Sequence, residues 1–88
     1  MISIKDIPHL KSVKPLVDYK LELTYSNGRV GIFDMNELLT YEVFSPLKDI
    51  EVFNKVKKNH GAIVWNEDID LCADSLYLKI TGEKLNNA

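Results

Sequence analysis

A strict alternation of apolar and polar residues, followed by a turn sequence, is the strongest constraint on how this chain folds. From Asp18 to Tyr25, a tyrosine or leucine stands at every odd position and a polar residue at every even one. A period of two is typical of a strand with one buried face. Ser26-Asn27-Gly28 then supplies residues that accept a positive φ, and 29–33 returns as a second strand. The sequence therefore predicts a β-hairpin.

Other segments extend the predicted sheet. Val13, Pro15 and Val17 fall on one face of an extended segment, and Pro15 suits an edge strand because proline donates no backbone hydrogen bond. A further strand is expected over 62–65, and another over 69–71, after an acidic bend. We expect these strands to form one small antiparallel sheet.

Short helices are predicted at three places. Asp34 and Asp49 can each cap a helical turn, because an aspartate side chain accepts hydrogen bonds from the free amides of the first turn. The spacing of apolar residues extends the second of these helices to Val56, and Asp74-Ser75 opens a last helix that covers the sheet. The expected fold class is α+β, a small antiparallel sheet with a β-hairpin and short helices packed on one face.

The predicted domain extends over residues 1–82, with a flexible C-terminal tail over 83–88. A chain of 88 residues has room for one hydrophobic core. The side chains expected in that core are Leu21, Leu23, Ile32, Phe53, Val64, Leu71 and Leu76.

Charge and cysteine content limit the partners and the compartment. The formal net charge of -2 removes the long-range attraction that a basic domain has for nucleic acid or anionic lipid. Cys72 is the single cysteine, and no apolar run has the length of a signal peptide or a membrane span. We therefore expect a cytoplasmic protein that binds no membrane and is unsuited to nucleic acid, while a homo-oligomer stays open.

The residues that could carry chemistry do not form a catalytic or metal-binding pattern. The acidic bend at 66–70 resembles the start of a calcium loop, but Leu71 and Tyr77 stand where that loop needs glycine and a bidentate glutamate. The two histidines and Cys72 lie far apart without zinc-site spacing, and no glycine motif for phosphates occurs. We expect no catalytic residue, no metal, no cofactor and no enzyme.

The single tryptophan, Trp65, stands beside the acidic bend and could anchor a partner surface together with Tyr77. Asp68 and Asp70 complete this candidate interaction surface. Burial of Trp65 between the sheet and the last helix is the alternative, and it is the commoner fate of tryptophan in a small domain. Whether Trp65 belongs to the core or to an interface stays open from the sequence.

Lys55, Lys57 and Lys58 form the one dense basic cluster of the sequence, the candidate basic patch. If they project from one side of the molecule, they could contact a phosphate backbone. A solvated helix end is the other interpretation, because the helix dipole favours lysines near a C-terminus.

A series of short motifs runs along most of the chain. In chain order they are Val13-Lys14-Pro15-Leu16, Asp18-Tyr19, Asn27-Gly28, Phe33-Asp34, Leu38-Leu39, Phe44, Pro46-Leu47-Lys48-Asp49, Phe53, Ile63-Val64-Trp65-Asn66, Asp70-Leu71 and Leu76-Tyr77. This order is similar to that of a small bacterial family known as domain of unknown function 2442. The sequence departs from the family pattern at Asn27, Asn66-Glu67 and Ala73, where the family often has aspartate, proline with glycine, and proline.

The resemblance implies an α+β domain that occurs alone or in front of a helix-turn-helix domain, and it brings no catalytic residues. Small stand-alone members are often encoded beside another short protein, in arrangements that resemble toxin-antitoxin pairs. We therefore predict a non-enzymatic protein-interaction module, an antitoxin-like or regulatory partner of another small protein. The alternative is a nucleic-acid-associated regulator that uses the candidate basic patch.

Overall fold

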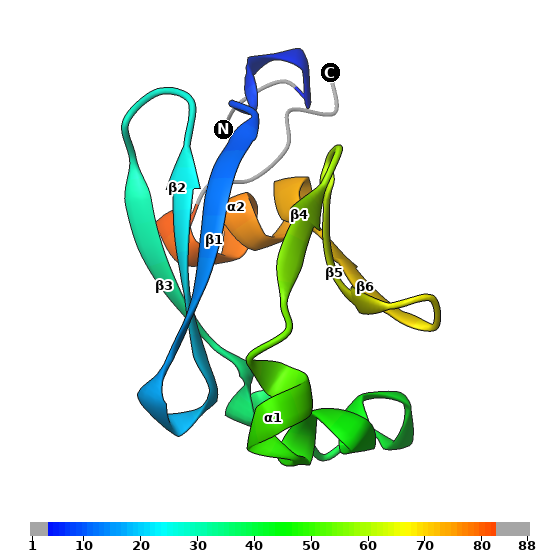
Figure 1. Cartoon of the computed structure of the whole chain (residues 1–88). Helices are drawn as coiled ribbons and strands as arrows, with labels where there is room; N and C mark the ends of the chain where they lie inside the picture. Colours follow the sequence, from blue (N-terminus) through cyan, green and yellow to red (C-terminus); the bar gives the residue numbers. More distant parts are fainter. Residues whose placement is uncertain (1–3, 83–88) are drawn as a thin grey trace.

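Two three-stranded antiparallel sheets form the framework of the protein (Figure 1). The computed structural model describes residues 4–82, and the tail expected at 83–88 lies outside the described residues. The strand orders are β1-β2-β3 and β4-β5-β6. The elements are β1 (Leu10–Leu16), β2 (Lys20–Tyr25), β3 (Val30–Asp34), α1 (Ile50–Phe53), β4 (Lys57–Asn59), β5 (Ala62–Asn66), β6 (Ile69–Cys72) and α2 (Ala73–Thr81). The α+β class expected from the sequence is confirmed.

The predicted hairpin forms β2 and β3 of the first sheet. Leu23 of β2 lies opposite Gly31 of β3. At the turn, the Tyr25 carbonyl oxygen accepts from the Gly28 N–H, and the Tyr25 N–H donates to the Arg29 carbonyl oxygen, both at 2.9 Å. Gly28 has a φ of 86°, a conformation that costs a residue with a β-carbon free energy. The hairpin and its turn are therefore as predicted.

Burial alternates along the hairpin as expected, but the phase on β3 differs from the prediction. The inward residues of β2, among them Leu21 and Tyr25, are fully buried. Directly opposed residues share a face, so Phe33, opposite Leu21, is buried as well. Ile32 lies opposite Glu22 on the other face and is 52% exposed. The prediction that Ile32 is a core residue is therefore wrong.

The second sheet contains a strand that the sequence did not predict. Helix α1 ends at Phe53 and does not continue to Val56, and Lys57–Asn59 forms β4. Lysine and asparagine are poor strand formers, so β4 depends on backbone pairing with β5, where Lys57 lies opposite Val64. The strands therefore make two sheets where we expected one, and β1 and β4 lie side by side between them (Figure 1).

The connection from β1 to β2 also differs from the expectation. Val17–Tyr19 forms a short 3₁₀ turn, η2, in which Tyr19 and the residue before it have φ values of 60° and 61°. Val17 is 81% exposed, so it does not share the inner face of β1. Tyr19 is held in this conformation because its hydroxyl donates to the Lys48 carbonyl oxygen and its ring meets Phe53 edge-on at 5.3 Å.

Two aspartates cap helical turns as predicted. Asp34 precedes the 3₁₀ turn η3 (Met35–Glu37), and its Oδ1 accepts from the Asn36 N–H at 2.9 Å. Asp49 precedes α1 in the same way and accepts from the Glu51 N–H at 3.0 Å. Between them, the 3₁₀ segment η4 (Glu42–Lys48) contacts α1, and Figure 1 shows this region at the bottom of the molecule, below β4.

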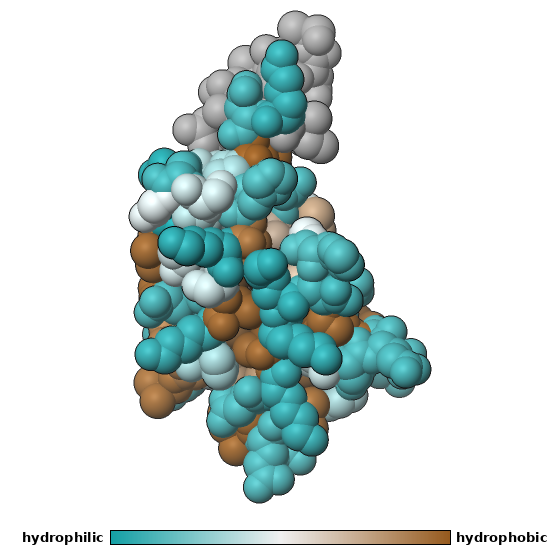
Figure 2. All heavy atoms as spheres, turned by 45° about the horizontal axis from the view of Figure 1, so that its top comes forward, coloured by the Kyte–Doolittle hydropathy of each residue, from teal (hydrophilic) through white to brown (hydrophobic). Residues whose placement is uncertain are grey.

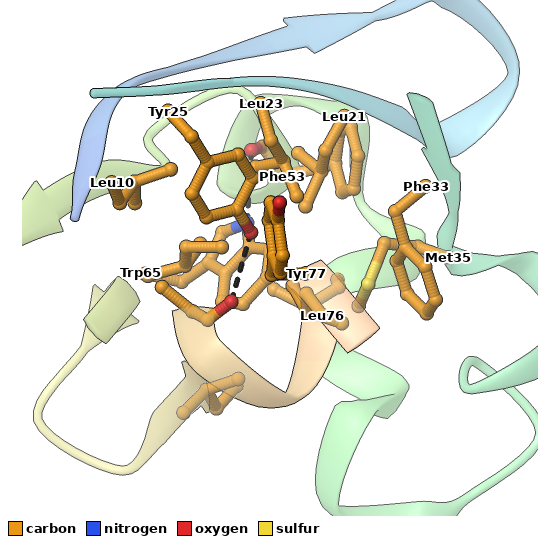
Figure 3. Close-up of a cluster of buried hydrophobic side chains, with 14 of the residues drawn as sticks. Leu10, Leu21, Leu23, Tyr25, Phe33, Met35, Phe53, Trp65, Leu76 and Tyr77 are labelled. Carbon is orange, nitrogen blue, oxygen red and sulfur yellow. Dashed lines mark hydrogen bonds between the residues drawn. The ribbon is translucent and has the colours of Figure 1, made fainter. Parts of the chain in front are cut away.

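Helix α2 packs against both sheets and closes the core. The Tyr25 hydroxyl of β2 donates to the carbonyl oxygen of Ala73, the first residue of α2, at 2.8 Å (Figure 3). The rings of Tyr25 and Tyr77 meet edge-on at 4.8 Å. Near the other end of α2, Ile80 lies on Gly31, where an added β-carbon would come within 2.2 Å of Ile80 Cδ1. Helix α2 is therefore fixed to the first sheet at both of its ends.

The core contains most of the side chains expected there. Those expected and found fully or almost fully buried are Leu21, Leu23, Phe53 and Leu76. The prediction that Val64 and Leu71 are core residues is wrong, because both are only partly buried. Val64 lies on the face of the central strand β5 opposite to that of Ile63 and Trp65, and Leu71 packs against the core from the edge strand β6.

Candidate interaction surface

Trp65 and Tyr77, the expected aromatic anchors, are core residues. Each is 5% exposed, and Figure 3 shows both among the buried side chains between the sheets and α2. The Trp65 indole N–H donates to the Phe53 carbonyl oxygen at 3.1 Å, so its polar atom is satisfied inside the protein. The sequence left open whether Trp65 lies in the core or at an interface, and in the structure it lies in the core. Neither ring offers a partner an exposed aromatic face.

Asp68 and Asp70, the acidic members of the candidate interaction surface, are exposed on the β5–β6 hairpin. The bend has an ordinary turn structure, because Asn66 Oδ1 accepts from the N–H groups of Asp68 and Ile69 at 2.8 and 3.0 Å. The four residues therefore do not form one surface, since two are in the core and two are on a hairpin. A binding role for Asp68 and Asp70 stays a prediction.

The three lysines of the candidate basic patch do not project from one helix. Lys55 lies in the turn after α1, and Lys57 and Lys58 are consecutive residues of β4, opposite Val64 and Ile63. Consecutive strand residues point to opposite faces, so the side chains of Lys57 and Lys58 diverge. The helix-end interpretation is wrong for these two lysines, because the helix ends before them.

The position of β4 beside β1 brings further lysines near this patch. Lys11 and Lys14 of β1 are exposed, as are Lys57 and Lys58 of β4. Hydrophilic side chains cover most of the face seen in Figure 2, with apolar side chains visible between them. Within residues 4–82, no carboxylate lies within 4.0 Å of these ammonium groups. The basic surface is therefore broader than the sequence cluster indicated, and it follows two strand edges.

Edge strands explain much of this charge distribution. An exposed strand edge invites pairing with another chain, and proteins discourage it with lysine, proline and other charged residues on the edge strand. The edge strand β1 carries Lys14 and Pro15, β4 carries Lys57, and β6 carries Asp70. These charges therefore have a structural role that needs no ligand.

Strand β3 is the exception among the described edge strands. Its sequence, Val30–Asp34, has no charge before its last residue. Val30 and Ile32 are 55% and 52% exposed on its outer face. Exposed apolar side chains on an edge strand without internal charge are typical of a site for strand addition. We take the outer face and free edge of β3 as the candidate interaction surface, and call it the β3 edge.

A shallow groove of about 480 Å³ adjoins the β3 edge. It is lined by residues of β3, η3 and α2, namely Ile32, Phe33, Asp34, Glu37, Lys79 and Ile80. Ile32 and Ile80 line the groove with apolar side chains. Its charged lining consists of Asp34, Glu37 and Lys79. A partner segment lying along β3 would therefore meet both apolar and charged side chains.

Hydrogen bonds from Asn36 hold the Asp34 carboxyl in its charged form at one end of the groove. The backbone N–H of Asn36, and then its side-chain amide, hold the pKa of the Asp34 carboxyl below its ordinary value. Asn36 Nδ2 also donates to the Asp18 carbonyl oxygen at 2.7 Å, which ties the end of β3 to the β1–β2 turn. Lys79 and Glu37 form an exposed ion pair at 3.9 Å that contributes little to stability. With two carboxylates and one ammonium group, the groove is net negative.

The sequence contains a signal for the β3 edge in the register of the hairpin. The apolar side chain of Ile32, taken alone, predicts a core position. The hairpin register, counted back from the turn at Gly28, puts Gly31 and Phe33 inside and leaves Val30 and Ile32 outside. Two outward β-branched residues on a strand with no charge before Asp34 indicate an unprotected edge.

Other chemistry has little support in the part of the chain that the structure describes. Within residues 4–82, no three histidine, cysteine, aspartate or glutamate side chains come together as a metal site. Cys72 is an exposed free thiol at the end of β6. In the same part of the chain, no helix combines the length and the apolar character needed to cross a bilayer.

The fold and the β3 edge define a class of protein, a small α+β domain of two antiparallel sheets with one unprotected apolar edge strand. A family model described as a protein of unknown function, DUF2442, matches residues 10–82. The chain belongs to this family, and the resemblance found in its motifs is confirmed. No curated protein matches the sequence.

A solved structure shares the fold. The chain is similar to a protein of Nitrosomonas europaea described as a putative DNA binding protein, with 27% sequence identity and a TM-score of 0.76. The match covers 85% of this chain and 50% of the other. The chain therefore spans half the length of that protein.

Proposed function

We propose that this protein is a protein-interaction module that binds its partner by strand addition at the β3 edge. The observation that carries the proposal is the exposure of Val30 and Ile32 on an edge strand without internal charge. Strand addition gives affinity through backbone hydrogen bonds and specificity through alternate side chains. The groove lined by Ile32 and Ile80 would supply the side-chain contacts.

A regulatory or antitoxin-like role in the bacterial cytoplasm fits such a surface better than catalysis does. Strand addition needs no reactive group, and it allows one short protein to hold another. The single exposed thiol of Cys72 suits a reducing compartment. The proposed module acts without a cofactor.

The test is capture of partner proteins by the tagged full chain in lysate of its own host. The informative variant is Val30→Lys, which places a charge on the β3 edge. Val17→Lys is the matched control, because it makes the same change at a residue that is 81% exposed in the β1–β2 turn. We expect a stoichiometric protein bound to the unaltered chain and to the control, and lost from Val30→Lys. Equal capture by both variants would contradict the proposal.

Nucleic acid is the second candidate partner, and two observations favour it. Lysines of β1 and β4 come together along the two neighbouring strand edges, and a similar structure is described as a putative DNA binding protein. Against this candidate stand the net charge of -2 and the edge-protecting role that these lysines already have.

Salt dependence separates the two candidates. Binding of duplex DNA through the lysines would lower log affinity with log salt at a slope of about -0.9 for each neutralised phosphate. In an electrophoretic shift assay at low salt with mixed-sequence DNA and RNA, we expect no retardation. Micromolar retardation that disappears when Lys55, Lys57 and Lys58 are all changed to glutamine would put the second candidate first.

A further inference from the structure

We propose that the free edge of β3 pairs with the β3 strand of a second copy of this chain, antiparallel and about a two-fold axis at Ile32. This inference rests on the proposed function and names the occupant of the β3 edge. The first sheets of the two copies, each with the order β1-β2-β3, would join into one continuous six-stranded sheet. Figure 1 shows β3 at the outer side of its sheet, with no strand beyond it.

The direction of the backbone groups of β3 follows from the hairpin. The Tyr25 N–H donates to the Arg29 carbonyl oxygen, so these two residues form a hydrogen-bonded pair. Hydrogen-bonded and non-hydrogen-bonded pairs alternate along an antiparallel ladder. With Leu23 opposite Gly31, the odd-numbered residues of β3 bond to β2. The even-numbered residues therefore direct their N–H and C=O groups to the free edge.

This alternation restricts the register of a two-fold pair. Only even-numbered residues can form hydrogen-bonded pairs across the new ladder, and odd-numbered residues face one another in the non-hydrogen-bonded pairs between them. An axis at Ile32 puts Ile32 opposite its own copy and Val30 opposite Asp34, so all outward backbone groups of the five-residue strand find partners. An axis at Gly31 leaves Asp34 without a strand partner, an axis at Phe33 leaves Val30 without one, and an axis at Val30 or Asp34 leaves most of the strand unpaired. The register at Ile32 is the one that pairs all three even-numbered residues of β3.

The side chains support the same register. The two Ile32 side chains, each 52% exposed, would cover one another on the outer face. Arg29, just before β3, would reach the far end of β3 in the second copy, where Asp34 and Glu37 lie. Within residues 4–82 the one ion pair joins Lys79 to Glu37, so the Arg29 guanidinium has no carboxylate partner among these residues. The pairing therefore brings opposite charges together at both ends of the strand.

The groove beside β3 gives a second strand room to approach. It lies between β3 and the C-terminal half of α2, and Ile80 and Lys79 form its far wall. Ile80 is kept back from the edge because it packs on Gly31. Two five-residue strands make an interface at the small end of the range, so we expect a dimer with a dissociation constant of about micromolar order.

A disulfide at the axis tests the register directly. Cys72 is the single cysteine, so Cys72→Ser gives a background without thiols. Ile32→Cys in that background would place two thiols on directly opposed residues, whose Cα atoms are about 5.5 Å apart in a hydrogen-bonded pair. That separation is within the reach of a disulfide. We expect mild oxidation to give a covalent dimer as the main product on a non-reducing gel.

Val30→Cys in the same background is the matched control. It exposes a thiol on the same strand and face, but the two copies of residue 30 would be four residues apart along the ladder, roughly 13 Å at about 3.3 Å per residue. We expect little covalent dimer from it. Equally fast crosslinking of both variants would overturn the register.

Sedimentation equilibrium tests pairing without any crosslink. We expect the unaltered chain to pass from monomer to dimer as its concentration rises through the micromolar range. Ile32→Lys should sediment as a monomer over the same range, and its circular dichroism spectrum should show that it is folded. A chain that stays monomeric at hundreds of micromolar would overturn self-pairing. If a different protein is then captured and lost with Val30→Lys, the proposed function holds and only this inference fails. If nothing is captured, both fail.

Discussion

The hydroxyl of Tyr25 donates to the carbonyl oxygen of Ala73 at 2.8 Å and so joins the central strand of the first sheet to the start of α2. Both residues are buried, and 47 residues separate them in the sequence. Tyr25→Phe removes this hydrogen bond and keeps the ring contact with Tyr77. We expect a loss of about 1 kcal/mol in the free energy of unfolding, measured by chemical denaturation. Tyr41→Phe, at a residue 59% exposed, is the control and should have no effect.

Tyr25 also makes the free energy of unfolding depend on pH in the alkaline range. Burial, and then the nearby charge of Asp74, raises the pKa of Tyr25 well above its ordinary value of 10.0. Above pH 10 the unfolded chain releases this proton while the folded chain keeps it, so stability falls as pH rises toward the folded-state pKa. We expect Tyr25→Phe to remove this part of the decline between about pH 9 and 11, where an ordinary tyrosine titrates. Parallel curves for both proteins would show that Tyr25 does not titrate differently on unfolding.

Gly31 of β3 is a point of close contact with α2. A β-carbon there would lie 2.2 Å from Ile80 Cδ1, so Gly31→Ala must displace the isoleucine. We expect a cost of about 1 to 3 kcal/mol, as for other overpacked sites. Combining it with Ile80→Ala frees the space, so the double variant should lose less than the sum of the two single variants. Additive losses in denaturant titrations would show that the two side chains do not compete for this space.

His60 occupies a backbone conformation better suited to glycine. It has a φ of 55° in the β4–β5 turn, although Gly61 is the next residue. His60→Gly should raise the free energy of unfolding by roughly 0.5 to 1 kcal/mol, because glycine adopts a positive φ without steric cost. His60→Ala removes the imidazole but keeps a β-carbon, so it should bring no gain. A melting temperature unchanged by His60→Gly would contradict the assignment of strain to this residue.

The start of α2 lacks a side-chain cap. Cys72 is its N-cap residue, with extended φ and ψ of -78° and 122°, but its side chain caps no backbone amide. Serine at this position accepts a hydrogen bond from the first turn of a helix. We therefore expect Cys72→Ser to raise the melting temperature by an amount equivalent to about 0.5 to 1 kcal/mol, and Cys72→Ala not to do so. A destabilised serine variant would indicate that the thiol has a packing role.

Local patterns were enough to predict the hairpin, its turn and the two aspartate caps, because each depends on residues near one another in the chain. The alternation in β2 and the φ of Gly28 are examples. Strand β4 could not be found in this way. Its residues have low strand propensity, and it exists because β5 offers backbone partners across the two-residue turn at His60.

The candidate site shows the same limit. Proximity in sequence groups Lys57 with Lys58, but strand β4 directs their side chains to opposite faces. The acidic residues beside Trp65 suggest an interface, but the contact with Phe53 places Trp65 in the core. The apolar side chain of Ile32 predicts a core position, and the register of β3 against β2 shows that it lies outside. In each case the deciding fact was a pairing between two elements, which the composition of one segment does not show.

The burial of Trp65, whose indole donates to the Phe53 carbonyl oxygen, allows tryptophan fluorescence to report whether the protein is folded. Trp65 is the one tryptophan of the whole sequence, so all indole fluorescence comes from a single buried site between the second sheet and α1. Its emission should lie at short wavelength in the folded protein and shift to the red when water reaches the ring. A partner bound at the β3 edge would leave this emission unchanged, since Ile32 and Trp65 belong to different sheets. One spectrum therefore distinguishes a variant that has lost its partner from a variant that has lost its fold.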